Sequence, residues 1–145
     1  NQHNTFNIMN DNKQSVTVEL IDEGKFQVKG GSADDLNPKA LILCGAAKCA
    51  GFTVMSLLKK EKITPKTLEI TVEGILDTPT LQPGSHFRSF NVIYNLECDT
   101  IEEQSIVGRA VTQAQEKYCG TVDMLRKIAP VAHEISIVST ETMKV

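Results

Sequence analysis

Apolar and polar side chains alternate along the first part of the chain, in residues 16–20 and again in residues 26–28. Residues 22–24, an acidic turn that ends in glycine, separate the two runs. Alternation with a period of two is typical of a strand with one buried face, and a short turn between two such runs predicts a β-hairpin. Phe6 and Ile8 indicate a further, earlier strand.

A long and almost wholly apolar stretch follows, and it predicts a helix over residues 38–60. Asn37 supplies a capping side chain, and Pro38 fits the first helical position, where a missing N–H costs nothing. Apolar residues cover nearly every face of this stretch, so the helix needs protein on all sides. A single chain rarely provides that, and we therefore expect a homodimer. Lys48 and two glycines interrupt the stretch, which favours a core helix over a membrane span.

The second half of the chain contains both periodicities. Residues 68–73 and 90–96 have the pattern of strands, with a proline-containing loop between them. A capping sequence at 100–103 opens an amphipathic helix, a short helix follows at 120–128, and residues 135–137 begin a last strand. This order of elements predicts an α+β fold in which helices pack on an antiparallel sheet.

The composition fits one globular domain over residues 1–145, with 41% hydrophobic and 23% charged residues. A net charge of −3 gives no basic surface for nucleic acid. The N-terminus lacks the features of a signal peptide, so we expect a cytoplasmic protein that does not bind a membrane. Its thiols should be mostly reduced, and neither the cysteine spacing nor the scattered histidines fit a metal site. We expect no cofactor.

Two of the four cysteines occupy positions that favour thiol chemistry. Cys49 lies half-way along the predicted apolar helix, and Cys119 lies where one helical pattern stops and the next begins. A helix start favours the thiolate and a dry pocket shelters it, so the two are candidates for a redox pair. The alternative is that both are small core residues. Cys44, about 140° from Cys49 around an ideal helix, is expected to be a core residue. Cys98, at a strand end, is expected to be an incidental, partly buried thiol.

The sequence around both cysteines resembles the OsmC/Ohr family of organic hydroperoxide reductases, and it is closest to the YhfA-like subgroup. In that family a proline opens the central helix and a cysteine follows eleven residues later, as Pro38 and Cys49 do here. Residues 114–125 resemble the second cysteine motif of the family, in which a cysteine, here Cys119, opens a short helix. The similarity extends over residues 37–138.

The resemblance implies antiparallel sheets packed around a long central helix in an intertwined homodimer, with active sites at the subunit interface. It implies that Cys49 attacks the peroxide and that Cys119 resolves the product to a disulfide, a peroxiredoxin-like chemistry. It also implies a small organic hydroperoxide as substrate, an external dithiol as reductant and a role in a stress response.

Two departures from the family pattern leave a second interpretation open. The peroxidases of this family set the thiolate with an arginine from the N-terminal sheet and a glutamate near the start of the central helix. Here residues 1–37 contain lysines but no arginine, and Lys39 and Ala40 follow Pro38. A lysine does not reproduce a bidentate guanidinium. The alternative is a non-catalytic OsmC-like dimer that binds a small apolar ligand or a partner in its cleft.

The remaining cations have less definite roles. Lys48 is the one charge within residues 40–58 of the predicted helix, where it either lines the pocket or reaches water along its stem. Arg88, Arg109 and Arg126 are expected on exposed faces. Of these three, Arg88 is the one to compare with Cys49.

Overall fold

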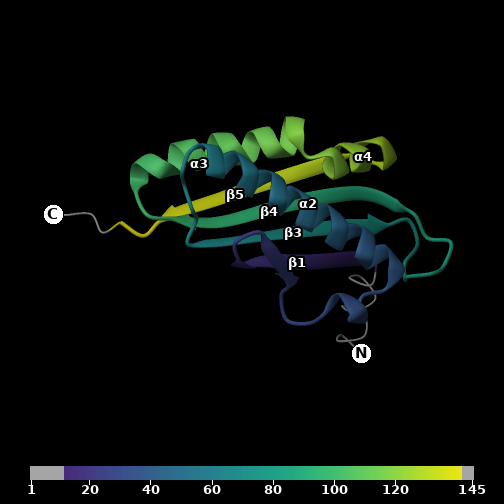
Figure 1. Cartoon of the computed structure of the whole chain (residues 1–145). Coiled ribbons are helices and arrows are strands. Elements are labelled where there is room, and N and C mark those ends of the chain that lie inside the picture. The colour runs from purple at the N-terminus through teal and green to yellow at the C-terminus, as the bar shows by residue number, and fades with distance from the viewer. Residues whose placement is uncertain (1–11, 142–145) are drawn as a thin grey trace, which may run out of the picture.

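The computed structural model describes residues 12–141 (Figure 1). Within this range the strands are β1 (Lys13–Asp22), β2 (Lys25–Val28), β3 (Thr67–Leu76), β4 (Phe87–Cys98) and β5 (Val131–Ser139). The helices are α2 (Pro38–Lys60), α3 (Ile101–Gln113) and α4 (Gly120–Ile128), with a 3-10 turn η1 (Ala33–Asp35) and a π-helical turn η2 (Ala114–Tyr118). The strand expected at Phe6 and Ile8 lies outside the described residues.

All five strands form one sheet in the order β2-β1-β3-β4-β5. The predicted hairpin is confirmed as β1–β2, and β1, β3 and β4 pair in antiparallel fashion. The α+β class is confirmed, but the expectation of a fully antiparallel sheet is wrong at one edge, because β5 runs parallel to β4. The chain leaves β4 through α3 and α4 and returns to the end where β4 began, and a parallel pair requires a crossover of this kind.

The three helices cover one face of the sheet, as Figure 1 shows. In β3 and β4 every second side chain is buried while the others are partly or fully exposed. That alternation is what a sheet covered on one face produces. α2 packs on β1 and β3, and α3 packs on β4 and β5, so the core lies between the sheet and the helices.

Local sequence explains the course of α2. The Asn37 side chain accepts a hydrogen bond from the Ala40 N–H at 2.9 Å, and Pro38 stands at the first helical position. Further along, the helix comes very close to the hairpin at Gly51, where an added Cβ would stand 2.6 Å from the ring of Phe26. Glycine therefore allows α2 to lie tightly across the sheet.

The outer side of α2 is apolar and open. Leu41, Ile42 and Phe52 are 44%, 49% and 48% exposed, so the expectation of protein on all sides is not met within one chain. By length and composition α2 also qualifies as a membrane span, a test that the core helices of globular proteins pass as well. Its inner side is buried against the sheet, as a core helix requires.

A thiol pair between two helices

The two cysteines singled out in the sequence meet in the structure. Cys49 lies in the middle of α2, and Cys119 is the residue that caps the N-terminus of α4. The Cys119 thiol donates a hydrogen bond to the Cys49 sulfur, with 3.4 Å between the two sulfur atoms, and both cysteines are free thiols. A disulfide has a sulfur–sulfur distance of about 2.05 Å, so an approach of roughly 1.4 Å would join them.

A π-helical turn places Cys119 at this position. The Cys119 N–H donates to the Ala114 carbonyl at 2.9 Å, five residues back, and this bond closes η2 at the end of α3. Cys119 itself has extended backbone angles, and α4 starts at the next residue, Gly120. Single π-turns within helices are frequent at functional sites. Here the turn ends one helix and aims the start of the next at α2.

Donors at the start of α4 act on Cys49. Burial raises the pKa of the Cys49 thiol, but hydrogen bonds from the Thr121 hydroxyl, the Thr121 backbone N–H and the Cys119 thiol outweigh it, and the pKa is lowered. Thr121 belongs to the first turn of α4, whose unpaired N–H groups and dipole favour a negative charge. Cys49 is therefore the thiol that ionises more readily.

Cys119 behaves in the opposite way. Burial raises its pKa to about 11, and the hydrogen bond to Cys49 and the charge of Cys49 act in the same direction. The backbone N–H groups of Val122 and Thr121 offset only part of this rise. The arrangement is a Cys49 thiol that ionises more readily than an ordinary cysteine, beside a Cys119 thiol that keeps its proton at neutral pH.

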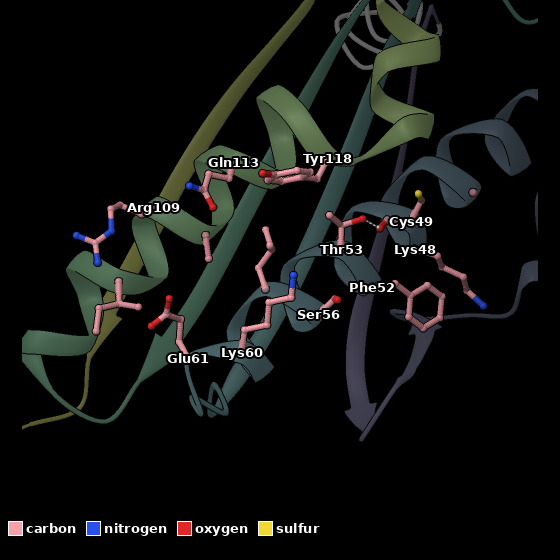
Figure 2. A pocket seen from close by; sticks show the side chains of 14 residues that line it. Lys48, Cys49, Phe52, Thr53, Ser56, Lys60, Glu61, Arg109, Gln113 and Tyr118 are labelled. Carbon is pink, nitrogen blue, oxygen red and sulfur yellow. Dashed lines mark hydrogen bonds between the residues drawn. The ribbon is translucent and has the colours of Figure 1, made fainter.

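A groove between α2 and α3 leads to Cys49 (Figure 2). Its volume is about 810 Å³. Its apolar wall includes Phe52, Leu57, Ile106, Ala110 and Tyr118. Figure 2 shows Cys49 with Lys48 and Thr53 at one end, and Lys60, Glu61 and Arg109 at the other. The groove therefore offers an apolar wall, with Lys48 near the sulfur and further charged groups at its far end.

The other two cysteines take no part in this site. Cys44 is 5% exposed and belongs to the core, as expected from its position on α2. Cys98 was expected to be partly buried but is fully buried, and its thiol donates to the Thr100 carbonyl at 3.4 Å. Both are structural residues.

Arg88 and Arg109 are exposed as expected, and Arg126 is the cation whose placement differs from the sequence expectation. Lys48 lines the groove, whereas Arg88 is exposed and is not among the groups that shift the pKa of either thiol. Arg109 also lines the groove. Arg126 was expected on an exposed face, but its side chain is only 32% exposed and donates to the Gln115 carbonyl. It is turned inward because α4 packs against η2.

Sequence reasoning missed three residues of the site. Thr121 acts on Cys49 from the first turn of α4. Tyr94 and Gln115 are fully buried behind the thiols, and the Tyr94 hydroxyl donates to Gln115 Oε1 at 2.5 Å. The position of Thr121, two residues after a cysteine at a helix start, could have indicated its role. Nothing in the sequence marks Tyr94 or Gln115 as residues of the site. Within residues 12–141 no group of three or more His, Cys, Asp or Glu side chains is placed to hold a metal ion.

Comparison with known proteins gives the class. The chain belongs to the family described as OsmC-like protein, whose family model matches residues 31–134. This family includes organic hydroperoxide resistance proteins. A relative in it is Protein YhfA of Escherichia coli K12, which is 26% identical over 113 residues, covering 76% of this chain and 80% of that protein.

Solved structures share the fold. A hypothetical protein from Aquifex aeolicus has a TM-score of 0.62 at 23% identity, over 87% of this chain and 96% of that one. An organic hydroperoxide resistance protein OsmC from Legionella pneumophila has a TM-score of 0.53 at 21% identity, over 75% and 73%. The organic hydroperoxide resistance protein OhrB of Bacillus subtilis has a TM-score of 0.52 at 18% identity, over 85% and 98%.

Proposed function

We propose that this protein is a thiol-dependent reductase of small organic hydroperoxides, in which Cys49 attacks the peroxide and Cys119 resolves the product. The observation that carries the proposal is the pair of sulfur atoms 3.4 Å apart with opposite protonation preferences. A reduction of this type needs one sulfur as a thiolate and a second thiol within reach of it. Membership of the OsmC-like family supports the same chemistry.

The proposed reaction is a two-electron exchange. The Cys49 thiolate attacks the outer oxygen of ROOH, the O–O bond breaks, and the alkoxide takes a proton from water to leave as ROH. The resulting Cys49 sulfenic acid is then attacked by the Cys119 sulfur, the S–O bond breaks, and the hydroxyl leaves as water with the Cys119 proton. The Cys49–Cys119 disulfide is reduced by an external dithiol through thiol–disulfide exchange.

The first turn of α4 supplies the thiolate stabilisation that an arginine gives in the family pattern. The Thr121 hydroxyl and N–H lower the Cys49 pKa against the cost of burial. Helix N-termini are known to lower thiol pKa values by this means. The absence of arginine from residues 1–37 is therefore compatible with an active Cys49.

We further propose that the active form is a homodimer. The outer side of α2 exposes Leu41, Ile42 and Phe52, next to the groove that holds Cys49. An apolar helix face of this kind is typical of a surface that another protein covers. A second copy on this face would enclose the groove and exclude water from it, which suits a small apolar hydroperoxide.

The test is the consumption of cumene hydroperoxide in the presence of dihydrolipoamide. We expect the wild-type protein to turn over and the Cys49→Ser variant to lose activity by at least about a thousandfold, because the nucleophile of the reaction is gone. The matched control is Cys44→Ala, which removes a buried thiol of the same helix and should retain activity. Equal rates for the wild type and Cys49→Ser would end the proposal.

A second candidate function is a non-catalytic dimer that binds a small apolar ligand. The groove of about 810 Å³ with its apolar wall favours it. A brief pulse of sub-stoichiometric cumene hydroperoxide separates the two functions by intact-protein and peptide mass spectrometry. Loss of two hydrogens as a Cys49–Cys119 disulfide supports the reductase, and an unmodified chain favours the binding protein.

A further inference from the structure

A buried amide in the π-helical turn that precedes Cys119 has an unused hydrogen-bond donor. Gln115 is 1% exposed, and its Nε2 atom has no hydrogen-bond partner within residues 12–141. Its Oε1 atom accepts from the Tyr94 hydroxyl at 2.5 Å, so the amide is held in one orientation. A buried donor without an acceptor is costly and rare. Its presence here points to an acceptor that arises in another state of the site.

Three elements hold Gln115 beside Cys119. Gln115 lies in the π-helical turn η2, four residues before Cys119, and the wide winding of such a turn brings those two positions to roughly the same side. Arg126 reaches back from α4 and donates to the Gln115 carbonyl. Tyr94 approaches from β4. Tyr94 of the sheet therefore holds the side-chain amide, while the turn and Arg126 of α4 hold the backbone of Gln115.

Tyr94 links the amide to both sulfur atoms. Burial raises the pKa of Tyr94, and negative charge on Cys119 and on Cys49 raises it further, while Arg126 acts against the rise. The phenol therefore lies near both thiols and remains protonated. Its single proton is already donated to Gln115, so the free Nε2 donor of Gln115 is the group in this cluster that is left to meet a new acceptor.

We propose that Gln115 is a positioning residue for the resolving step, an inference that rests on the proposed function. During that step the Cys119 sulfur loses its proton to the departing hydroxyl and gains negative charge as it attacks the Cys49 sulfenic acid. The Nε2 donor of Gln115 stabilises this charge and turns the sulfur toward Cys49. No electrons beyond those of the two thiols and the peroxide are needed, and the products are the disulfide and water.

The decisive variant is the double substitution Tyr94→Phe with Gln115→Met. It removes the donor and also its buried partner, so no polar group is left orphaned, and replacing both partners by apolar groups is close to neutral for stability. After a pulse of cumene hydroperoxide, dimedone trapping followed by mass spectrometry measures how long the sulfenic acid persists. The matched control is Gln104→Met on α3, whose amide donates to the Ile137 carbonyl away from the site.

We expect the double variant to form the sulfenic acid at the wild-type rate and to close the disulfide about tenfold to a hundredfold more slowly, as the loss of a hydrogen bond to a charged group predicts. Its unfolding midpoint should stay near that of the wild type. Gln104→Met should close the disulfide at the wild-type rate. Disulfide closure at the wild-type rate in the double variant would overturn the role of Gln115.

A second oxidant separates this inference from the proposed function. Diamide adds to the Cys49 thiol, and the Cys119 sulfur then displaces the hydrazine to form the same disulfide without any peroxide chemistry. If the wild type forms neither the sulfenic acid nor the disulfide with cumene hydroperoxide, the proposed function fails. Slow closure after diamide in the double variant would still support the positioning role, and closure at the wild-type rate would overturn it.

Discussion

The two cysteines of the site differ in a way that their places in the fold do not suggest. Cys119 caps the N-terminus of α4, the position where a thiolate is usually favoured, yet its pKa is raised to about 11. Cys49 lies in the middle of α2, and its pKa is lowered. The first turn of α4 directs the Thr121 donors across to Cys49, while Cys119 is only 2% exposed. Thiol ionisation depends on where donors point and how dry the sulfur is.

This asymmetry assigns different work to two neighbouring sulfur atoms. A thiolate is the better nucleophile, so Cys49 is suited to the first attack. A thiol that keeps its proton does not compete for the peroxide, and it can deliver the proton that turns the departing hydroxyl into water. The role of each sulfur atom can be tested separately by substitution.

After the loss of the Cys49 nucleophile itself, the largest effect is expected from removing the second sulfur. In Cys119→Ser the first equivalent of cumene hydroperoxide should be reduced at the wild-type rate, because the Cys49 thiolate is retained. Steady-state turnover should fall by about a hundredfold, since an external dithiol replaces a thiol held at high effective molarity. Single-turnover measurements check the rate of the first reduction, and steady-state measurements on the same sample check the turnover.

The accumulating species identifies the step that has failed. Cys49 should be recovered as the sulfenic acid, trapped by dimedone and located by peptide mass spectrometry. The matched control is Cys98→Ala, which removes a buried thiol outside the site. Full turnover by Cys119→Ser would show that the 3.4 Å contact has no part in the reaction.

A smaller effect is expected from Thr121. In Thr121→Val the hydroxyl that acts on Cys49 is lost, so the Cys49 pKa should rise and its alkylation by iodoacetamide at pH 7 should slow by about tenfold, the size of a hydrogen bond to a charged group. The rate is followed as a function of pH on the Cys49 peptide. Thr121→Ser keeps the hydroxyl and should restore the reactivity; a slow Thr121→Ser would place the effect in packing instead.

Much of the fold could be predicted from the sequence, because its signals are local. The alternation in residues 16–20, the start of α2 at Asn37 and Pro38, and the capping sequence at 100–103 each depend on neighbouring residues. The parallel pairing of β5 was not predictable, since it depends on the path of the chain through α3 and α4. Local patterns specify elements, but they do not specify the direction in which a returning strand enters the sheet.

The residues of the site also divide into those that the sequence indicates and those that only the fold brings together. Cys49 and Cys119 stand out in the sequence because thiols are few and both positions relate to helices. Gln115 and Tyr94 do not stand out, because their pairing joins η2 to β4 through the folded core. Arg126 looks like a surface residue of a short amphipathic helix until the packing of α4 turns it inward.

The smallest expected effect is on stability at high pH, and it directly tests the raised pKa of Cys119. A folded-state pKa of about 11 lies above the ordinary value of 9.0, so the folded protein holds this proton more tightly than the unfolded chain does. The contribution is fully present below pH 9 and is lost as pH rises towards 11. The lowered pKa of Cys49 has the opposite effect on the free energy of unfolding. Its stabilising contribution is retained above pH 9 and is lost only as pH falls through the lowered pKa.

We therefore expect the wild-type free energy of unfolding to fall between pH 8 and pH 10 by about 1 kcal/mol more than that of Cys119→Ala. Urea unfolding at pH 8, 9 and 10 with reductant present measures this difference. Tyr94 begins to add a loss of its own as the pH approaches its ordinary pKa of 10.0, but both proteins carry Tyr94, so the difference between them reports on Cys119. Equal declines in the two proteins would mean that Cys119 is not held as a neutral thiol. The assignment of the nucleophile to Cys49 would then rest on the hydrogen bonds from Thr121 and Thr53 that lower the Cys49 pKa.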